Sequence, residues 1–79
     1  MDMDREWEVE HLHLADDHIA MAERHVTKQR LLVERLRTGG HDAHEAERLL
    51  GTMEGTLEAF REHRQSIADA IDRIDARRA

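Results

Sequence analysis

Apolar residues recur in steps of three and four along two long stretches of the chain. The first series is Leu12, Ala15, Ile19, Ala22, Val26, Gln29, Val33 and Leu36. The second series is Ala46, Leu50, Met53, Leu57, Phe60, Arg64, Ile67, Ile71 and Ile74. Such spacing marks the a and d positions of a heptad, which place one apolar seam along a helix. The pattern therefore predicts two amphipathic helices, over about 4–38 and 43–77.

A short glycine-containing segment separates the two helical stretches. Gly39 and Gly40 can adopt the left-handed backbone conformation that ends a helix. Asp42 is placed to cap the second helix, and Glu45 three residues later would complete a capping box. A turn as short as 39–42 makes the two helices antiparallel. The predicted fold is all-α, a coiled-coil-like antiparallel two-helix hairpin that forms a single domain over residues 1–79.

The residues beside the seam allow the register of this hairpin to be predicted. If the turn centres near residue 41, facing residues have numbers that sum to about 82. The seam pairs are then Ala22 with Phe60, Val26 with Leu57, and Leu36 with Ala46. On one flank, the e positions pair Arg37 with Glu47, Arg30 with Glu54, and Glu23 with Arg61. We call this flank the charged edge. All three pairs have opposite signs, which favours this register.

Two polar residues interrupt the seam. Gln29 and Arg64 occupy core positions, where polar side chains more often fix register and partner number than carry out chemistry. Arg64 is long enough to reach Asp16 or Glu23 on the facing helix. Binding of an anionic ligand by Arg64 inside a bundle is the alternative.

The flank opposite the charged edge carries almost no fixed charge. Its g and c positions form a row that we call the second stripe. On the first helix the row is Trp7, His11, Leu14, His18, Met21, His25, Lys28 and Leu32. On the second helix it is Leu49, Thr52, Thr56, Ala59, His63, Ser66 and Ala70. Because this row lies roughly 100° from the seam, one hairpin cannot bury both. We expect a homodimer that forms a four-helix bundle; the alternative is a monomer with a hydrated stripe.

Seven histidines in a short chain raise the question of a metal site. His11, His18 and His25 are seven residues apart, or about 10 Å along a helix, which is too far to share one ion. A di-iron bundle needs carboxylates at core positions, and this seam has none. His18 and His63 remain candidate ligands, because the register places them together and a dimer would double them. The favoured interpretation is that these are neutral interface histidines that bind no metal, which predicts a dimer that weakens as the pH falls through about 6.5.

Composition narrows the classes of function. Charged residues make up 38% of the chain and the net charge is −6, which argues against binding nucleic acid. The chain has no cysteine, so thiol chemistry and disulfides are excluded. No apolar run reaches the roughly 20 residues that span a bilayer, and the acidic N-terminus is not a secretory signal. We expect a cytoplasmic protein without a membrane segment. No nucleophile–base pair or phosphate-binding loop is present, so we expect no enzymatic activity and no cofactor.

Two segments carry a resemblance to known proteins. From His11 to Ile67, the chain resembles a group of short bacterial helical proteins that have no assigned function. The likeness rests on "HIAMAERHVTKQRLLVERLRTGGHD" and "AERLLGTMEGTLEAFREHR". It implies a shared hairpin type and no catalytic or binding residue. Gly51 and Gly55 depart from the group and lie inside the second helix.

Two classes of function follow from these patterns. The leading prediction is a small non-catalytic module that interacts or regulates through its helix faces as a homo-oligomer. Its partner could also be an amphipathic helix of another protein, laid into an apolar groove. The alternative is a four-helix bundle that binds a transition metal through its histidines.

Overall fold

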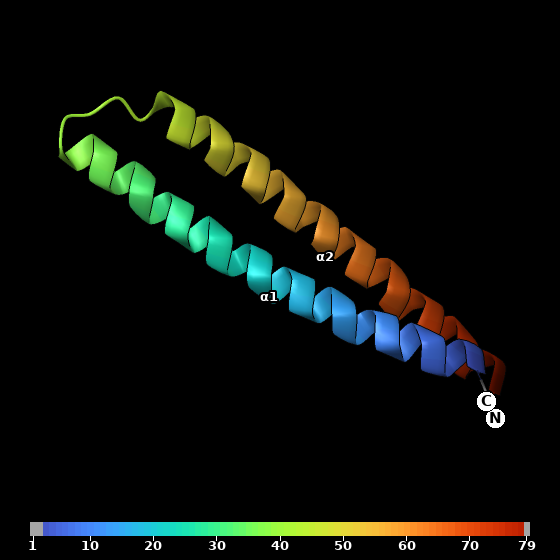
Figure 1. Cartoon of the computed structure of the whole chain (residues 1–79). Coiled ribbons are helices and arrows are strands. Elements are labelled where there is room, and N and C mark those ends of the chain that lie inside the picture. The colour runs from blue at the N-terminus through green and yellow to red at the C-terminus, as the bar shows by residue number, and fades with distance from the viewer. Residues whose placement is uncertain (1–2, 79) are drawn as a thin grey trace.

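The computed structural model describes residues 3–78 as two α-helices, α1 (Met3–Thr38) and α2 (His44–Arg78). The helices lie side by side and antiparallel, joined at one end by a short loop (Figure 1). The chain extends over 60 × 14 × 14 Å. Its radius of gyration of 18.0 Å exceeds the about 12 Å of a compact chain of this length. The prediction of an antiparallel helical hairpin is confirmed.

The loop begins with a Schellman motif. Gly40 has a φ of 73°, the left-handed conformation expected of one of the two glycines. The N–H of His41 donates to the Leu36 carbonyl at 2.8 Å, and the N–H of Gly40 donates to the Arg37 carbonyl at 3.1 Å. These two bonds satisfy carbonyls that the end of α1 would leave without partners. The glycine pair therefore ends α1 at the predicted residue.

The start of α2 differs from the prediction in one respect. An Oδ1 of Asp42 accepts a hydrogen bond from the His44 N–H at 2.9 Å, so the predicted cap forms. The Ala43 carbonyl accepts from the Glu47 N–H, and α2 begins at residue 44 rather than 43. The capping box was wrong, because the Glu45 carboxylate accepts a 2.8 Å bond from Arg48 instead of reaching back. An arginine three residues away offers the exposed carboxylate a charged donor.

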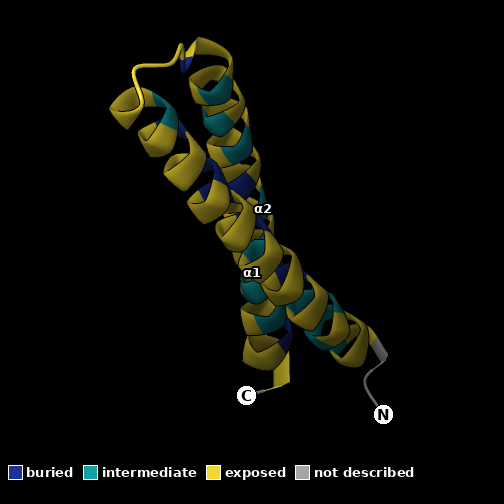
Figure 2. Cartoon of the chain, turned by 60° about the vertical axis from the view of Figure 1, so that its left-hand side comes forward, coloured by how far each residue is buried: buried dark blue, intermediate teal, exposed yellow. Residues whose placement is uncertain are grey.

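The seam lies between the helices as predicted. Every seam position in both series is buried or half-buried, and the buried residues line the inner side of each helix (Figure 2). Its centre is a cluster of Ala22, Val26 and Leu57, against which Phe60 packs. This cluster contains two of the three predicted seam pairs. Gln29 is 8% exposed, and its Nε2 donates to the Ala46 carbonyl at 3.0 Å, so the polar seam residue has a partner.

The core of the single hairpin is thin. Within residues 4–78, no side chain is completely enclosed, and most buried residues are alanine or valine. Neither helix, over the same residues, contains a stretch long and apolar enough to cross a membrane. A chain of this size with one narrow seam gains little stability from its own core.

Candidate functional site

The charged edge forms as the register predicts. Nitrogen–oxygen distances are 2.6 Å for Arg37–Glu47, 3.3 Å for Arg30–Glu54 and 3.8 Å for Glu23–Arg61. The side chains involved remain 42–63% exposed. Exposed pairs of this kind contribute about 0.2–1 kcal/mol each. The charged edge therefore specifies register more than it stabilises the hairpin.

Two seam arginines extend the charged edge. Arg64 pairs with Asp16, one of the two partners expected for it, so this guanidinium is engaged within the hairpin. Arg5 pairs with Asp75 at 2.8 Å, which the sequence reasoning missed. Arg5 lies one heptad before Leu12 in the a series of α1, and Asp75 lies two heptads beyond Arg61 in the e series of α2. This a-to-e pair repeats the relation of Arg64 to Asp16. That repetition was the signal available in the sequence.

The second stripe is open to solvent in the single chain. Its large apolar side chains are exposed by 59% for Trp7, 54% for Leu14, 50% for Met21, 43% for Leu32 and 49% for Leu49. Only one other large apolar side chain of the described residues is as open, Leu31 at 46%, and it points away from both edges. The stripe therefore concentrates the large exposed apolar side chains of residues 4–78 on one face.

The hydroxyl groups on this face have partners within their own helix. Thr52 donates to the Arg48 carbonyl at 3.3 Å, and Thr56 donates to the Thr52 carbonyl at 3.2 Å. Ser66 repeats the arrangement with a carbonyl four residues earlier, at 3.3 Å. A buried hydroxyl without a partner costs free energy, whereas these donors are already bonded. The hydroxyl groups on the α2 half of the second stripe can therefore be covered by an apolar surface at low cost.

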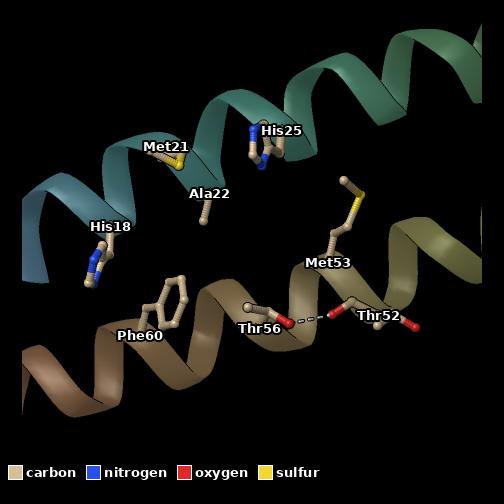
Figure 3. A pocket seen from close by; sticks show the side chains of 8 residues that line it. All are labelled: His18, Met21, Ala22, His25, Thr52, Met53, Thr56 and Phe60. Carbon is tan, nitrogen blue, oxygen red and sulfur yellow. Dashed lines mark hydrogen bonds between the residues drawn. The ribbon is translucent and has the colours of Figure 1, made fainter.

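The middle of the stripe is hollowed into a groove of about 310 Å³, the central groove (Figure 3). It is lined by His18, Met21, Ala22, His25, Thr52, Met53, Thr56 and Phe60. Figure 3 shows that the rings of His18 and Phe60 come together from opposite helices. The sequence analysis assigned Met53 and Phe60 to the seam alone. Their d positions adjoin the g positions of the stripe, which is why they also form part of this groove.

Two further hollows lie along the same face. The turn groove, about 600 Å³, is lined by Gln29, Leu32, Leu36, Asp42, Glu45, Ala46, Arg48, Leu49 and Thr52. The terminal groove, about 240 Å³, is lined by Asp4, Trp7, Glu8, Ala70, Arg73, Ile74 and Arg77. Residues of the second stripe contribute to all three grooves. The face is thus apolar at its centre and has charged residues in the walls of both outer grooves, and it forms a series of shallow hollows rather than one deep pocket.

Two histidines of the stripe pack on aromatic rings. The His18 ring lies 5.8 Å from that of Phe60, and the His11 ring lies 4.3 Å from that of Trp7. His13, His41 and His44 are exposed. Within residues 3–78, no three or more histidine, aspartate or glutamate side chains are grouped to hold a metal ion. A site built on His18 and His63 would therefore need ligands from a second chain.

Ser66, the hydroxyl nearest in sequence to His63, is bonded to the carbonyl of Glu62. Comparison with protein-family models, curated proteins and solved structures finds no match to this chain. The resemblance to short bacterial helical proteins therefore stays a prediction.

Proposed function

We propose that this protein is a non-catalytic interaction module that works as a homodimer, in which two hairpins join their second stripes into a four-helix bundle. The observation that carries the proposal is the placement of the exposed apolar side chains. Six large apolar side chains are exposed among residues 4–78, and five of them lie on that one face. Single exposed apolar residues are ordinary, whereas a continuous row supports a macromolecular partner.

The area of the face suits a second copy of this chain. A face 60 Å long and 14 Å wide has a footprint of roughly 800 Å², which is the area that each partner buries in a standard interface. A second hairpin has the same length and width. It would cover the whole row from Trp7 to Leu32 without leaving either end exposed.

The composition of the face also supports self-association. The α1 half carries the large side chains Trp7, Leu14 and Met21, while the α2 half carries smaller ones such as Thr56 and Ala59. In a two-fold dimer each chain can place its large side chains over the small ones of the other. The surface is therefore complementary to itself in size.

The thin core gives a further reason for a partner. A hairpin whose buried residues are mostly alanine and valine has little apolar area to offset the conformational entropy of folding. A four-helix bundle would bury the seam and the second stripe together. Dimerisation and folding are then coupled in this proposal.

The competing function is a bundle that binds a transition metal. His18 and His25 both line the central groove, so a second copy could bring further imidazoles near them. Native mass spectrometry of the tag-free protein separates the two functions, because it reads subunit number and bound metal together. A metal-free dimer supports the interaction module, and a dimer with stoichiometric metal supports the alternative.

The direct test compares two glutamate substitutions at equally exposed apolar positions. Met21→Glu places a charge in the middle of the second stripe, whereas Leu31→Glu places it on the outward face as the matched control. An unpaired carboxylate in a dry interface costs about 3 kcal/mol or more, so we expect at least about a hundredfold weaker dimerisation for Met21→Glu. Sedimentation equilibrium gives both dissociation constants.

The control variant also defines the result that would contradict the proposed interface. Leu31→Glu should dimerise as the unchanged protein does, because its side chain lies off the stripe. Equal dissociation constants for the two variants would remove the second stripe as the interface. Circular dichroism of both variants shows whether lost dimerisation is accompanied by lost helix, as coupled folding predicts.

A further inference from the structure

Two hairpins can bring their second stripes face to face in two ways, and an inference about their orientation rests on the proposed homodimer. A two-fold axis parallel to the helices leaves both loops at the same end and sets α1 of each copy on α2 of the other. A two-fold axis across the helices puts the loops at opposite ends, and it sets α1 on α1 and α2 on α2. The two orientations therefore differ in which half of the second stripe each half meets.

We propose that the two copies lie with their loops at the same end, so that α1 of each packs on α2 of the other. Such an axis keeps every residue at its own level along the bundle. Within one chain, Arg37 pairs with Glu47 and Arg5 pairs with Asp75, so facing residues have numbers that sum to about 82 along the whole hairpin. The same sum identifies the residues that meet across the interface between the copies.

The outer flank of this interface matches large side chains with small ones. The c positions of each helix lie on the outer flank, farther from the seam than the g positions. Leu14 of one copy lies at nearly the level of Ser66 of the other, and Met21 lies at nearly the level of Ala59. All four side chains are exposed in the single chain. Each large side chain of α1 therefore has a small side chain of α2 opposite it.

The inner row of the interface consists of g positions. The pairs that meet there are His11 with Ala70, His18 with His63, His25 with Thr56, and Leu32 with Leu49. Two of these pairs again set a larger side chain on a smaller one, and the other two set like on like. The Thr56 hydroxyl is bonded to a carbonyl of its own helix, so His25 can cover it. No pair brings an acid, lysine or arginine into the inner row.

The two ends of the outer flank hold charged residues that suit the same orientation. Arg35 follows Lys28 in the c positions of α1, and Glu45 precedes Thr52 in those of α2. Arg35 of one copy and Glu45 of the other lie at nearly one level, so their opposite charges attract. At the far end, Trp7 lies at nearly the level of Arg73, where a guanidinium can stack on the indole.

The opposite-end orientation loses the match in size. Met21 would face Met21 of the other copy near the axis, and Ala59 would lie near Ser66. Large side chains would hold the two α1 helices apart, and small ones would leave a gap between the two α2 helices. Such a gap forfeits packing energy. Charge separates the orientations less, because Glu45 would then lie near the arginines that end α2.

A distance measured between spin labels tests the orientation. The chain has no cysteine, so Thr38→Cys gives one labelled site, at an exposed residue at the end of α1. With the loops at the same end, the two labels lie at one level and about 30 Å apart, which is two helix diameters plus the label arms. With the loops at opposite ends, they lie about 50 Å apart, because about 35 helical residues separate their levels. Double electron–electron resonance distinguishes these distances.

A second labelled site serves as the matched control. Glu62→Cys lies near the middle of α2 at an exposed position, so both orientations give a short distance there. Short distances at both sites support the same-end dimer. A long distance at residue 38 with a short one at residue 62 overturns this orientation and leaves the homodimer standing. No dipolar signal at either site overturns the homodimer itself.

Engineered disulfides give an independent readout. Mixed Met21→Cys and Ala59→Cys chains should cross-link with each other on oxidation, because these positions face each other only in the same-end dimer. Met21→Cys alone should not cross-link, since the two α1 helices then lie diagonally across the bundle. Leu31→Cys, similarly exposed but on the outward face, is the matched control and should not cross-link with Ala59→Cys. Efficient cross-linking of Met21→Cys with itself would overturn the proposal.

Discussion

The charged edge and the second stripe flank the same seam, but they differ in composition and in how far one chain satisfies them. On the charged edge, acids and arginines of the two helices meet in ion pairs, and their side chains stay largely hydrated. On the second stripe the helices present large apolar side chains, small residues and histidines, with hydroxyls that bond their own backbone. The charged edge is complete within one chain, whereas the second stripe is left uncovered.

This difference assigns the choice of helix register to one edge and most of the remaining stabilisation of the hairpin to the other. Exposed ion pairs contribute little free energy each but strongly disfavour registers that bring like charges together. Apolar area contributes about 25 cal/mol per Å², and it does so only when something covers it. The hairpin therefore holds its register through one edge and, in our proposal, gains most of its remaining stability through the other.

The largest effect is expected from a charge on the α2 half of the second stripe. Ala59→Asp introduces a carboxylate among small side chains that a second copy would cover, so dimerisation should weaken by about a hundredfold or more. Ala20→Asp, also exposed but off the stripe, is the matched control and should leave the dissociation constant unchanged. Analytical ultracentrifugation measures both. Similar behaviour of the two variants would contradict the contrast between the faces.

An intermediate effect is expected from pH, because histidines occur on the second stripe and not on the charged edge. A histidine covered while neutral in the dimer binds fewer protons than one exposed in the monomer. Association is therefore full above the ordinary histidine range and weakens as the pH falls through about 6.5. No carboxylate lines the central groove to offset a charge on His18 or His25. We expect at least tenfold weaker dimerisation at about pH 5.5 than at about pH 7.5.

Glutamine substitutions locate the source of this pH dependence. Replacing His18 and His63 together should reduce the pH dependence, since both lie on the second stripe, and the remainder should come from His11 and His25. Replacing His13 and His44, which lie off it, should leave the profile as it was. A dissociation constant independent of pH in the unchanged protein would show that the histidines are not covered by association.

The smallest effect is expected on the charged edge. Glu54→Arg sets two arginines opposite each other and should lower the free energy of unfolding by up to about 1 kcal/mol. Adding Arg30→Glu restores opposite signs and should recover most of that loss. Urea denaturation measures both at fixed protein concentration. A changed subunit number in either variant would mean that the charged edge takes part in association.

Much of the fold could be predicted because the seam pattern and the register reinforce each other. Val26 and Leu57 meet in the seam, and Arg37 meets Glu47, because one antiparallel register satisfies all these positions. The end of α1 was predictable for a local reason, since Gly40 adopts a conformation that other residues resist. Periodicity over long helices is a robust signal of structure.

Side-chain hydrogen bonds and packing that depend on competing nearby partners could not be predicted from the sequence. Glu45 could bond the backbone behind it or Arg48 ahead of it, and the sequence contains no signal that ranks these two hydrogen bonds. Likewise, the grooves depend on how far Met53 and Phe60 reach past the seam, which is a matter of side-chain packing. The positions of the second stripe follow from spacing alone, but the surface that covers it does not.

The central claim is that the second stripe joins two copies of this chain, and the molar mass in solution tests it most directly. Sedimentation equilibrium of the tag-free protein at micromolar concentration should give twice the 9.2 kDa of one chain. A dimer that Met21→Glu dissociates and Leu31→Glu preserves is the result that the account predicts. A single species of 9.2 kDa at that concentration would contradict it and leave the stripe as a face for a different partner.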